Sequence, residues 1–369
     1  PLSQKAQDEA IRLMLPSNNL LKPADGSPIT LPNKEMALGI YFLTAIDETL
    51  TKPEQEQAYF ENERAAIMAY DTGMIKLKEA IHVRITEHGV RKMVETNVGR
   101  IRLNELLPDA FDYVNESINA AGIKKLITKA MKLCSAQEVT ELIDSVKSLG
   151  FYGATISGLS VSVFDNIMVP EKNQMIQDAE KKVVVIDTEY QRGLITLDEK
   201  KRLSNDVWMK ATDEIARLTW ANLKSSNPIK VSIDSGGSRA GVEQLKQLSA
   251  IRGLIVDPLG KIVELPVKSN FREGLSIFEY VASARGSRKG LTDSALKTAN
   301  AGYLTRRLVD VSHDVIIMQE DCGVTEGTTV TTTDPDRTAA FEDRIIGRIL
   351  AANALGKSRK IILKAGEEI

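Results

Sequence analysis

Residues 271–314 read FREGLSIFEYVASARGSRKGLTDSALKTANAGYLTRRLVDVSHD, and this stretch decides the fold. Ser276 followed three residues later by Glu279 forms a capping box, which predicts that a helix begins there. Because no proline follows until Pro335, the helix can continue without a break. A helix of about 35 residues would be roughly 50 Å long at about 1.5 Å per residue, which is long enough to bridge two packed masses.

From Ser276 onward, the cations of this stretch outnumber its carboxylates. Glu279, Asp293, Asp310 and Asp314 stand against a larger basic set, which consists of Arg285, Arg288, Lys289, Lys297, Arg306 and Arg307. Three glycines inside the stretch, Gly286, Gly290 and Gly302, each cost about 1 kcal/mol relative to alanine and soften the helix. A helix of this kind suits a polyanionic partner. A structural helix with a solvated charged face has the same features, so the residues alone leave both interpretations open.

Several stretches carry a resemblance to one family. K-S-N-F-R-E-G-L (268–275), R-K-G-L (288–291) and A-L-K-T-A-N-A-G-Y-L-T-R-R-L-V-D-V (295–311) resemble the bridge helix of the β′ subunits of bacterial DNA-directed RNA polymerases. The N-terminal segments at 15–44 and 94–108 resemble the same family, as do the helical and strand-like segments between Asp112 and Asp165. The likeness therefore extends over several independent parts of the chain.

Length, composition and charge bound the class of protein. The 369 residues are enough for two or three domains, and 43% hydrophobic with 27% charged residues is an ordinary globular balance. A net charge of −2 means that any nucleic-acid-binding surface must be local. No apolar run approaches the length of a membrane span. Two cysteines, Cys134 and Cys322, argue against a disulfide scaffold and favour a reducing compartment.

The pattern of the chain predicts a mostly helical α+β fold with several domains, an antiparallel helical hairpin and one long bridging helix. The hairpin is expected from 171–190 and from a second helix that Thr196 and Glu199 cap. The resemblance to the β′ family implies three regions: a pore-like α+β region at 1–165, a funnel region with the hairpin and a glycine-rich loop at 166–262, and the long helix with the start of a cleft module at 263–369. Local pattern further predicts helices at 54–70 and 344–355, and strands at 74–86, 94–103, 151–165, 261–266 and 360–364.

The chain contains no conventional catalytic constellation. Its histidines, His82, His88 and His313, are far apart and lack metal-ligand spacing. The glycine-rich loop from Asp234 to Gly241 precedes a helix, so its backbone N–H groups could hold a phosphate. It lacks the Lys-Ser/Thr of a P-loop, and a plain turn remains the alternative.

The resemblance implies roles for particular residues. The middle of the bridge helix, where this family places the template base, matches Lys297, Thr298, Ala299, Gly302 and Tyr303. Phosphates of the nucleic acid would meet Arg288, Lys289, Arg306 and Arg307. Arg239 would lie beside the path by which nucleotides enter, although its loop is one residue longer than in the family. The hairpin would form the rim of the secondary channel, where cleavage factors dock.

The resemblance also implies cofactors and partners. The aspartates that hold catalytic Mg²⁺ would precede the position of Pro1, and the trigger loop would follow Ile369. Cys322, in E-D-C-G, resembles the first of four Zn²⁺ ligands, with the others downstream. The implied partners are the DNA template, the RNA transcript, nucleoside triphosphates, the β, α and ω subunits, sigma factor and cleavage factors, with no membrane.

The leading hypothesis is therefore a cytoplasmic, nucleoid-associated segment of a nucleotidyltransferase that is inactive alone. The alternative hypothesis is a non-catalytic helical scaffold or binding protein.

Overall fold

The computed structural model describes residues 2–369 except positions 48, 52, 54–55, 88, 258–259, 264, 317, 320–322, 325, 333–337 and 357–359. The chain folds as two compact units. The larger unit comprises residues 32–123 and 144–304. The smaller unit comprises residues 1–31, 124–143 and 305–369.

A three-stranded sheet lies near the start of the larger unit. Strand β2 (Ile81–Glu87) pairs with β1 (Tyr59–Phe60) in parallel and with β3 (Val90–Thr96) antiparallel, in a register that places Val83 opposite Val94. Alternate residues of β2 are buried, as a strand with one face on a core requires. This part of the strand prediction at 74–86 is confirmed, but the strand begins only at Ile81.

Two asparagine caps shift the predicted element boundaries. The side chain of Asn62 accepts from Ala65 N–H at 2.8 Å and starts α3 (Glu63–Asp71), so the helix predicted to begin at Glu54 begins later. Asn97 accepts from Arg100 N–H at 2.8 Å and starts α4 (Val98–Asn104). The strand predicted over 94–103 is therefore wrong beyond Thr96, because the cap begins a helix there.

Glycines allow three helices of the larger unit to meet backbone to backbone. A Cβ on Gly39 of α2 (Glu35–Thr44) would lie 1.8 Å from the carbonyl oxygen of Gly150 in α6 (Ala136–Ser157). A Cβ on Gly99 of α4 would lie 2.0 Å from the carbonyl oxygen of Leu43. The strand prediction at 151–165 is wrong because α6 continues to Ser157, and its glycines serve close packing rather than an extended chain.

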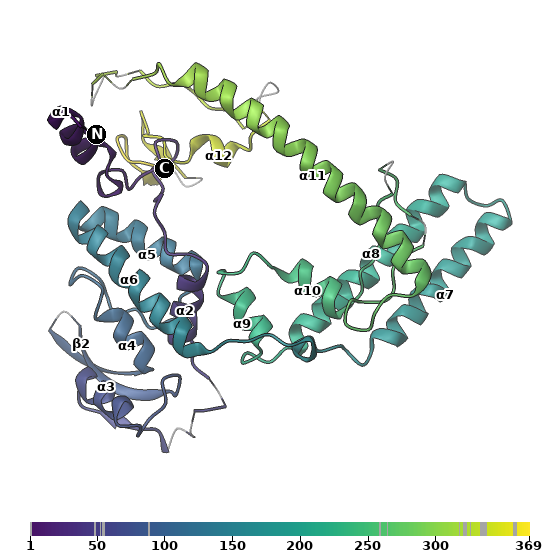
Figure 1. Cartoon of the computed structure of the whole chain (residues 1–369), viewed down its shortest axis with the longest axis horizontal. Helices are drawn as coiled ribbons and strands as arrows, with labels where there is room; N and C mark the ends of the chain where they lie inside the picture. Colours follow the sequence, from purple (N-terminus) through teal and green to yellow (C-terminus); the bar gives the residue numbers. More distant parts are fainter. Residues whose placement is uncertain are drawn as a thin grey trace. The chain divides into compact units, whose positions relative to one another are not determined.

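Four further helices follow in the larger unit: α7 (Lys172–Gln191), α8 (Leu197–Asn222), α9 (Pro228–Asp234) and α10 (Val242–Ser249). Helices α7 and α8 pack side by side (Figure 1). The predicted cap at Thr196 is confirmed, since its hydroxyl accepts from Glu199 N–H at 3.3 Å. The strand predicted at 261–266 does not form among the described residues, where Ile262 makes only an isolated bridge with Val256.

The stretch at 271–314 forms α11 (Ile277–Ser312), a single helix of 36 residues (Figure 1). This confirms the prediction of one long uninterrupted helix. None of the described helices has the length and apolarity needed to cross a membrane.

The smaller unit joins both ends of the chain. Its described elements are α1 (Gln4–Glu9), a π-helical turn (Ala10–Met14), a 3₁₀ turn (Pro16–Asn18), most of α5 (Ala120–Leu133), the first part of α6, the last part of α11, α12 (Phe341–Ile345), β4 (Ala354–Leu355) and β5 (Ile361–Leu363). Strands β4 and β5 pair antiparallel, which confirms the strand expected at 360–364. The helix expected at 344–355 is wrong, because α12 stops at Ile345 and Gly347, with φ of 73°, follows. The chain as a whole is α+β and mostly helical, as the sequence predicted.

Candidate nucleic-acid interface on the long helix

Helix α11 carries most of the residues that the sequence singled out, and hydrogen bonds fix its start. The Ser276 hydroxyl accepts from Glu279 N–H at 3.4 Å, and Ser276 N–H donates to the Glu279 carboxylate at 3.0 Å. The predicted capping box is therefore present. Among the 36 residues of α11, all of which the structure describes, Ser283 alone is buried. The helix thus presents a long surface, and exposed apolar groups on such a surface mark a site of interaction.

The cations of the first half of α11 are partly engaged by one loop. Arg285 forms an ion pair with Asp257 at 3.0 Å, and Lys289 Nζ donates to the Asp257 carbonyl oxygen at 3.3 Å. Gly286 packs against the same loop, because a Cβ there would lie 3.0 Å from Ile255 Cγ2. Arg288, by contrast, is exposed. Lys289 can reach a phosphate only by leaving this carbonyl, whereas Arg288 can do so from where it lies.

The middle of α11 is exposed. Lys297, Thr298, Ala299, Gly302 and Tyr303 are all exposed. The Thr298 hydroxyl is turned back onto its own helix, where it donates to the Ser294 carbonyl at 2.8 Å. A Cβ on Gly302 would meet no heavy atom of the described residues within 4 Å. The structure therefore brings these five residues onto one accessible stretch of roughly two turns.

The second half of α11 combines exposed cations with exposed apolar side chains. Arg306 and Arg307 are exposed, and Arg306 lies 3.9 Å from Asp310. The large apolar side chains exposed along the whole helix are Ile277, Phe278, Tyr280, Val281, Leu291, Leu296, Tyr303, Leu304, Leu308, Val309 and Val311. A helix that is apolar on several sides is typical of one surrounded by other protein or nucleic acid.

Four backbone N–H groups of the glycine-rich loop are already engaged within the protein. Its N–H groups at Gly236, Gly237, Ala240 and Gly241 donate to acceptors within the loop and its flanking helices, at 2.7–3.2 Å. A Cβ on Gly237 would lie 2.2 Å from the carbonyl oxygen of Lys34, so this glycine serves close packing against the start of α2. Arg239 is exposed and lines a cavity of about 280 Å³ with Lys34 and Glu35 among its other residues.

The structure gathers no metal ligands within the part of the chain that it describes. No group of three or more His, Cys, Asp or Glu side chains there is placed to hold a metal ion. Cys322 and His88 lie outside the described residues. Cys134, on the smaller unit, is a half-buried free thiol at the end of α5.

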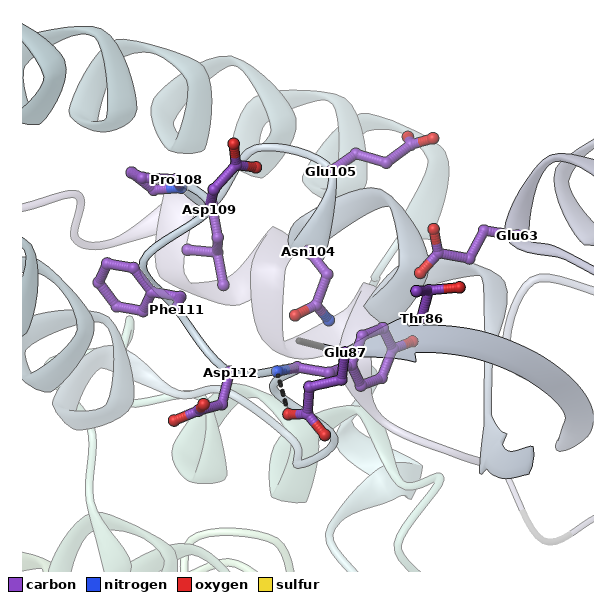
Figure 2. A pocket seen from close by; sticks show the side chains of 11 residues that line it. Glu63, Thr86, Glu87, Asn104, Glu105, Pro108, Asp109, Phe111 and Asp112 are labelled. Atoms are coloured by element: carbon purple, nitrogen blue, oxygen red, sulfur yellow. Dashed lines mark hydrogen bonds between the residues drawn. The ribbon is translucent and has the colours of Figure 1, made fainter. Parts of the chain in front are cut away.

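Sequence reasoning missed an acidic pocket of about 250 Å³ near the sheet (Figure 2). Burial, with the nearby charge of Glu105, raises the pKa of Glu63. Hydrogen bonds from Lys92 and Tyr113 N–H hold the pKa of Glu87 below its ordinary value, and burial raises the pKa of Tyr113 to about 12. The carboxylates come from separate elements, so no local motif predicts the pocket. Among the described residues they form no group placed to hold a metal ion.

Comparison with known proteins identifies two segments of the chain. Residues 19–166 match the family described as RNA polymerase Rpb1, domain 3, and residues 274–358 match RNA polymerase Rpb1, domain 5. The second match includes all of α11.

Similarity to named proteins extends over the full length. The chain is 40% identical over 372 residues to the "DNA-directed RNA polymerase subunit beta'" of Pelotomaculum thermopropionicum, covering 100% of this chain and 31% of the relative. The corresponding subunits of Desulforudis audaxviator and Thermoanaerobacter sp. are 40% and 39% identical, again over 100% of this chain and 32% of each relative. The chain thus spans about a third of the length of these relatives. On these two grounds it belongs to the family of bacterial RNA polymerase β′ subunits.

Proposed function

We propose that this chain is a segment of the catalytic subunit of a DNA-directed RNA polymerase, and that α11 is its bridge helix. The supporting observation is a coincidence of two facts. The chain is similar to β′ subunits over its full length, and its most polymerase-like stretch is a continuous helix of 36 residues with an exposed middle. The reaction would be template-directed nucleotidyl transfer in transcription.

The proposal assigns a role to each region of the chain. Residues 1–165 would be the pore-like region, residues 166–262 the funnel with α7 and α8 as the rim of the secondary channel, and residues 263–369 the bridge helix with the start of the cleft module. Arg239 would lie beside the path of incoming nucleotides. Its exposed position in a cavity with Lys34 is compatible with that role.

The contribution of α11 to catalysis would be positioning. Ala299 and Gly302 carry little or no side chain, so a template base could approach the helix backbone closely. Phosphates would be met by Arg288, Lys289, Arg306 and Arg307, since cations that contact phosphates fix register without reading sequence. Lys297, Thr298 and Tyr303 would complete the surface at the insertion site. Holding reactants in the right geometry is a large part of catalysis in phosphoryl transfer.

The catalytic metal of the reaction would be held outside this chain. The described residues do not fit a Mg²⁺ or a Zn²⁺ site, so no step within this chain is assigned to a metal. Catalytic Mg²⁺ would be held by aspartates upstream of residue 1. Cys322 would be one Zn²⁺ ligand, with its partners downstream. The chain alone is accordingly expected to be inactive.

The partners under this proposal are the DNA template, the RNA transcript, nucleoside triphosphates, the β, α and ω subunits, sigma factor and cleavage factors that dock on α7 and α8. The complex would work in the bacterial cytoplasm at the nucleoid.

Neutralising Arg306 and Arg307 tests the nucleic-acid contact. In the reassembled polymerase, the double substitution Arg306→Ala and Arg307→Ala is expected to weaken binding of a DNA–RNA hybrid. The plot of log binding constant against log salt concentration has a negative slope, and its magnitude should decrease by about 2. This is roughly 1 for each phosphate that an arginine no longer neutralises. The measurement is a salt titration of hybrid affinity by fluorescence anisotropy.

Arg217→Ala is the matched control, since Arg217 is an exposed arginine of α8 that pairs with Glu214 at 2.6 Å. It should leave the slope unchanged. An unchanged slope for the double variant would contradict the contact. Failure of the assembled protein to bind any hybrid would favour the alternative function, a non-catalytic helical scaffold.

Replacing Gly302 with alanine tests whether the middle of α11 bends during translocation. Alanine favours the helix by about 1 kcal/mol, and no atom of the described residues lies within 4 Å of the new Cβ. The folded structure should therefore be retained while the helix becomes stiffer. The elongation rate of the reassembled enzyme on a defined template is expected to change severalfold.

Ser294→Ala serves as the control for this prediction, because it also favours the exposed helix without removing a glycine. It should elongate at the wild-type rate. Equal elongation rates for Gly302→Ala and the wild type would contradict the bending hypothesis.

A further inference from the structure

The loop at residues 268–276, called the anchor loop here, touches both helices that pack beside it. Lys268 forms an ion pair with Glu180 of α7, and its ammonium lies 5.7 Å from the ring centroid of Trp208 in α8. At the first residue of α7, Lys172 pairs with Glu273, and only 5% of the Lys172 side chain is exposed. Both members of the α7–α8 pair are thus joined to the anchor loop by charged groups.

The same loop is bound firmly to the start of α11. The Glu279 carboxylate accepts from Lys268 N–H at 2.9 Å, from Ser269 N–H at 3.1 Å and from the Ser269 hydroxyl at 2.9 Å. It also accepts from Ser276 N–H at 3.0 Å and the Ser276 hydroxyl at 2.8 Å. Burial by itself would raise the pKa of Glu279, but these hydrogen bonds hold the pKa at about 2. The carboxylate is therefore charged at neutral pH and links the loop to the first turn of the helix.

A third set of hydrogen bonds fixes the anchor loop to the end of α10. The Asn270 side chain is fully buried and donates to the carbonyl oxygens of Ser249 and Ala250 at 2.9 and 3.1 Å. Phe271 N–H donates to the Gln247 carbonyl at 3.1 Å. Buried hydrogen bonds from an amide group are costly to break, so we expect the anchor loop and the end of α10 to move together.

We infer that the anchor loop mechanically couples the α7–α8 pair to α11, with Lys268, Glu273 and Glu279 as positioning residues. A displacement of α7 and α8 would therefore alter the order of the first turns of α11 through Lys268 and Glu273. Only the consequence for elongation depends on the proposed function; the coupling itself does not.

Charge reversal at the Lys268–Glu180 pair tests the coupling. The chain is purified with the proteins that accompany it, and hydrogen exchange is followed in peptides that cover residues 277–290. Lys268→Glu and Glu180→Lys are each expected to raise the exchange rate there by about threefold or more, because each replaces an attraction by a like-charge repulsion. The double variant, which restores an ion pair, should return the rate to within about twofold of wild type.

Two further results separate coupling from a general loss of structure. The effect of each single variant should disappear at about 1 M salt, where the screening length is about 3 Å. Reversing the exposed Arg217–Glu214 pair on α8, as Arg217→Glu with Glu214→Lys, should leave exchange in α11 unchanged. Unchanged exchange in both single variants would overturn the inference, as would failure of the double variant to restore protection.

Because exchange is read without substrate or turnover, failure of the coupling is distinguishable from failure of the proposed function. The elongation rate of the same variants then tests whether the coupling matters to the polymerase. Altered exchange with an unchanged elongation rate would confirm the coupling and count against its role in transcription.

Discussion

Gly39→Ala is expected to destabilise the larger unit by more than about 3 kcal/mol, although alanine is the better helix former. The intrinsic gain from alanine is about 1 kcal/mol. The new Cβ would lie 1.8 Å from the Gly150 carbonyl oxygen and 2.6 Å from the Ala154 nitrogen, and both obstacles are backbone atoms of α6. The two helices must therefore separate, and overpacking of this severity exceeds the propensity gain. Hydrogen exchange in α2 and in residues 144–157 of α6 should rise accordingly.

Gly290→Ala is the matched control for this steric argument. Gly290 also lies inside a helix, but a Cβ there would meet no heavy atom of the described residues within 4 Å. That variant should be as stable as the wild type or gain up to about 1 kcal/mol. If Gly39→Ala left exchange in α2 unchanged, the close crossing of α2 and α6 would be wrong.

Arg100→Met is expected to cost about 3 kcal/mol of folding free energy. Arg100 is only 8% exposed, and its guanidinium donates to the Thr44 carbonyl at 2.8 Å and to the Asn115 carbonyl and side-chain oxygens at 3.1 and 3.0 Å. Burial lowers the pKa of Arg100, but an arginine remains charged at neutral pH. Methionine fills similar space without donors, so buried acceptors would be left unpaired. Urea unfolding of the purified protein measures the loss.

Arg217→Met is the control for Arg100, because the Arg217 side chain is 68% exposed and its pair with Glu214 is solvated. Removing such a pair should cost less than about 1 kcal/mol. Equal losses for the two methionine variants would show that the Arg100 hydrogen bonds contribute no more than a surface ion pair.

Local signals predict the helices well where they include a cap and a long periodic stretch. Ser276 with Glu279 and Thr196 with Glu199 place the starts of α11 and α8 to within one residue. Two strand predictions are wrong because a residue typical of a strand end or a turn instead serves a helix, as a cap or as a close-packing glycine. The predicted strand at 94–103 runs through Asn97, whose side chain instead caps α4. Gly153 falls within a predicted extended segment, although it lies in α6 against Gly39.

The residues of the candidate interface can also be predicted from local sequence. Its residues lie within one predicted helix, so sequence order alone places Lys297, Gly302 and Arg306 on the same element. The acidic pocket and the contacts of the anchor loop could not be found in this way, because each brings together residues from elements far apart in the chain. Lys172 and Glu273, for example, are brought together only by folding.

By itself, the sequence determined the family, the long helix and its caps, because these depend on contiguous residues and on hydrogen bonds within a few positions. Only the tertiary structure decided which glycines are spacers, which cations are already paired and how the anchor loop joins α7 and α8 to α11. The physical reason is that steric closeness and charge pairing depend on distances in space. A Cβ at Gly39 is excluded by a carbonyl 111 residues along the chain, at Gly150, whereas one at Gly302 meets open space.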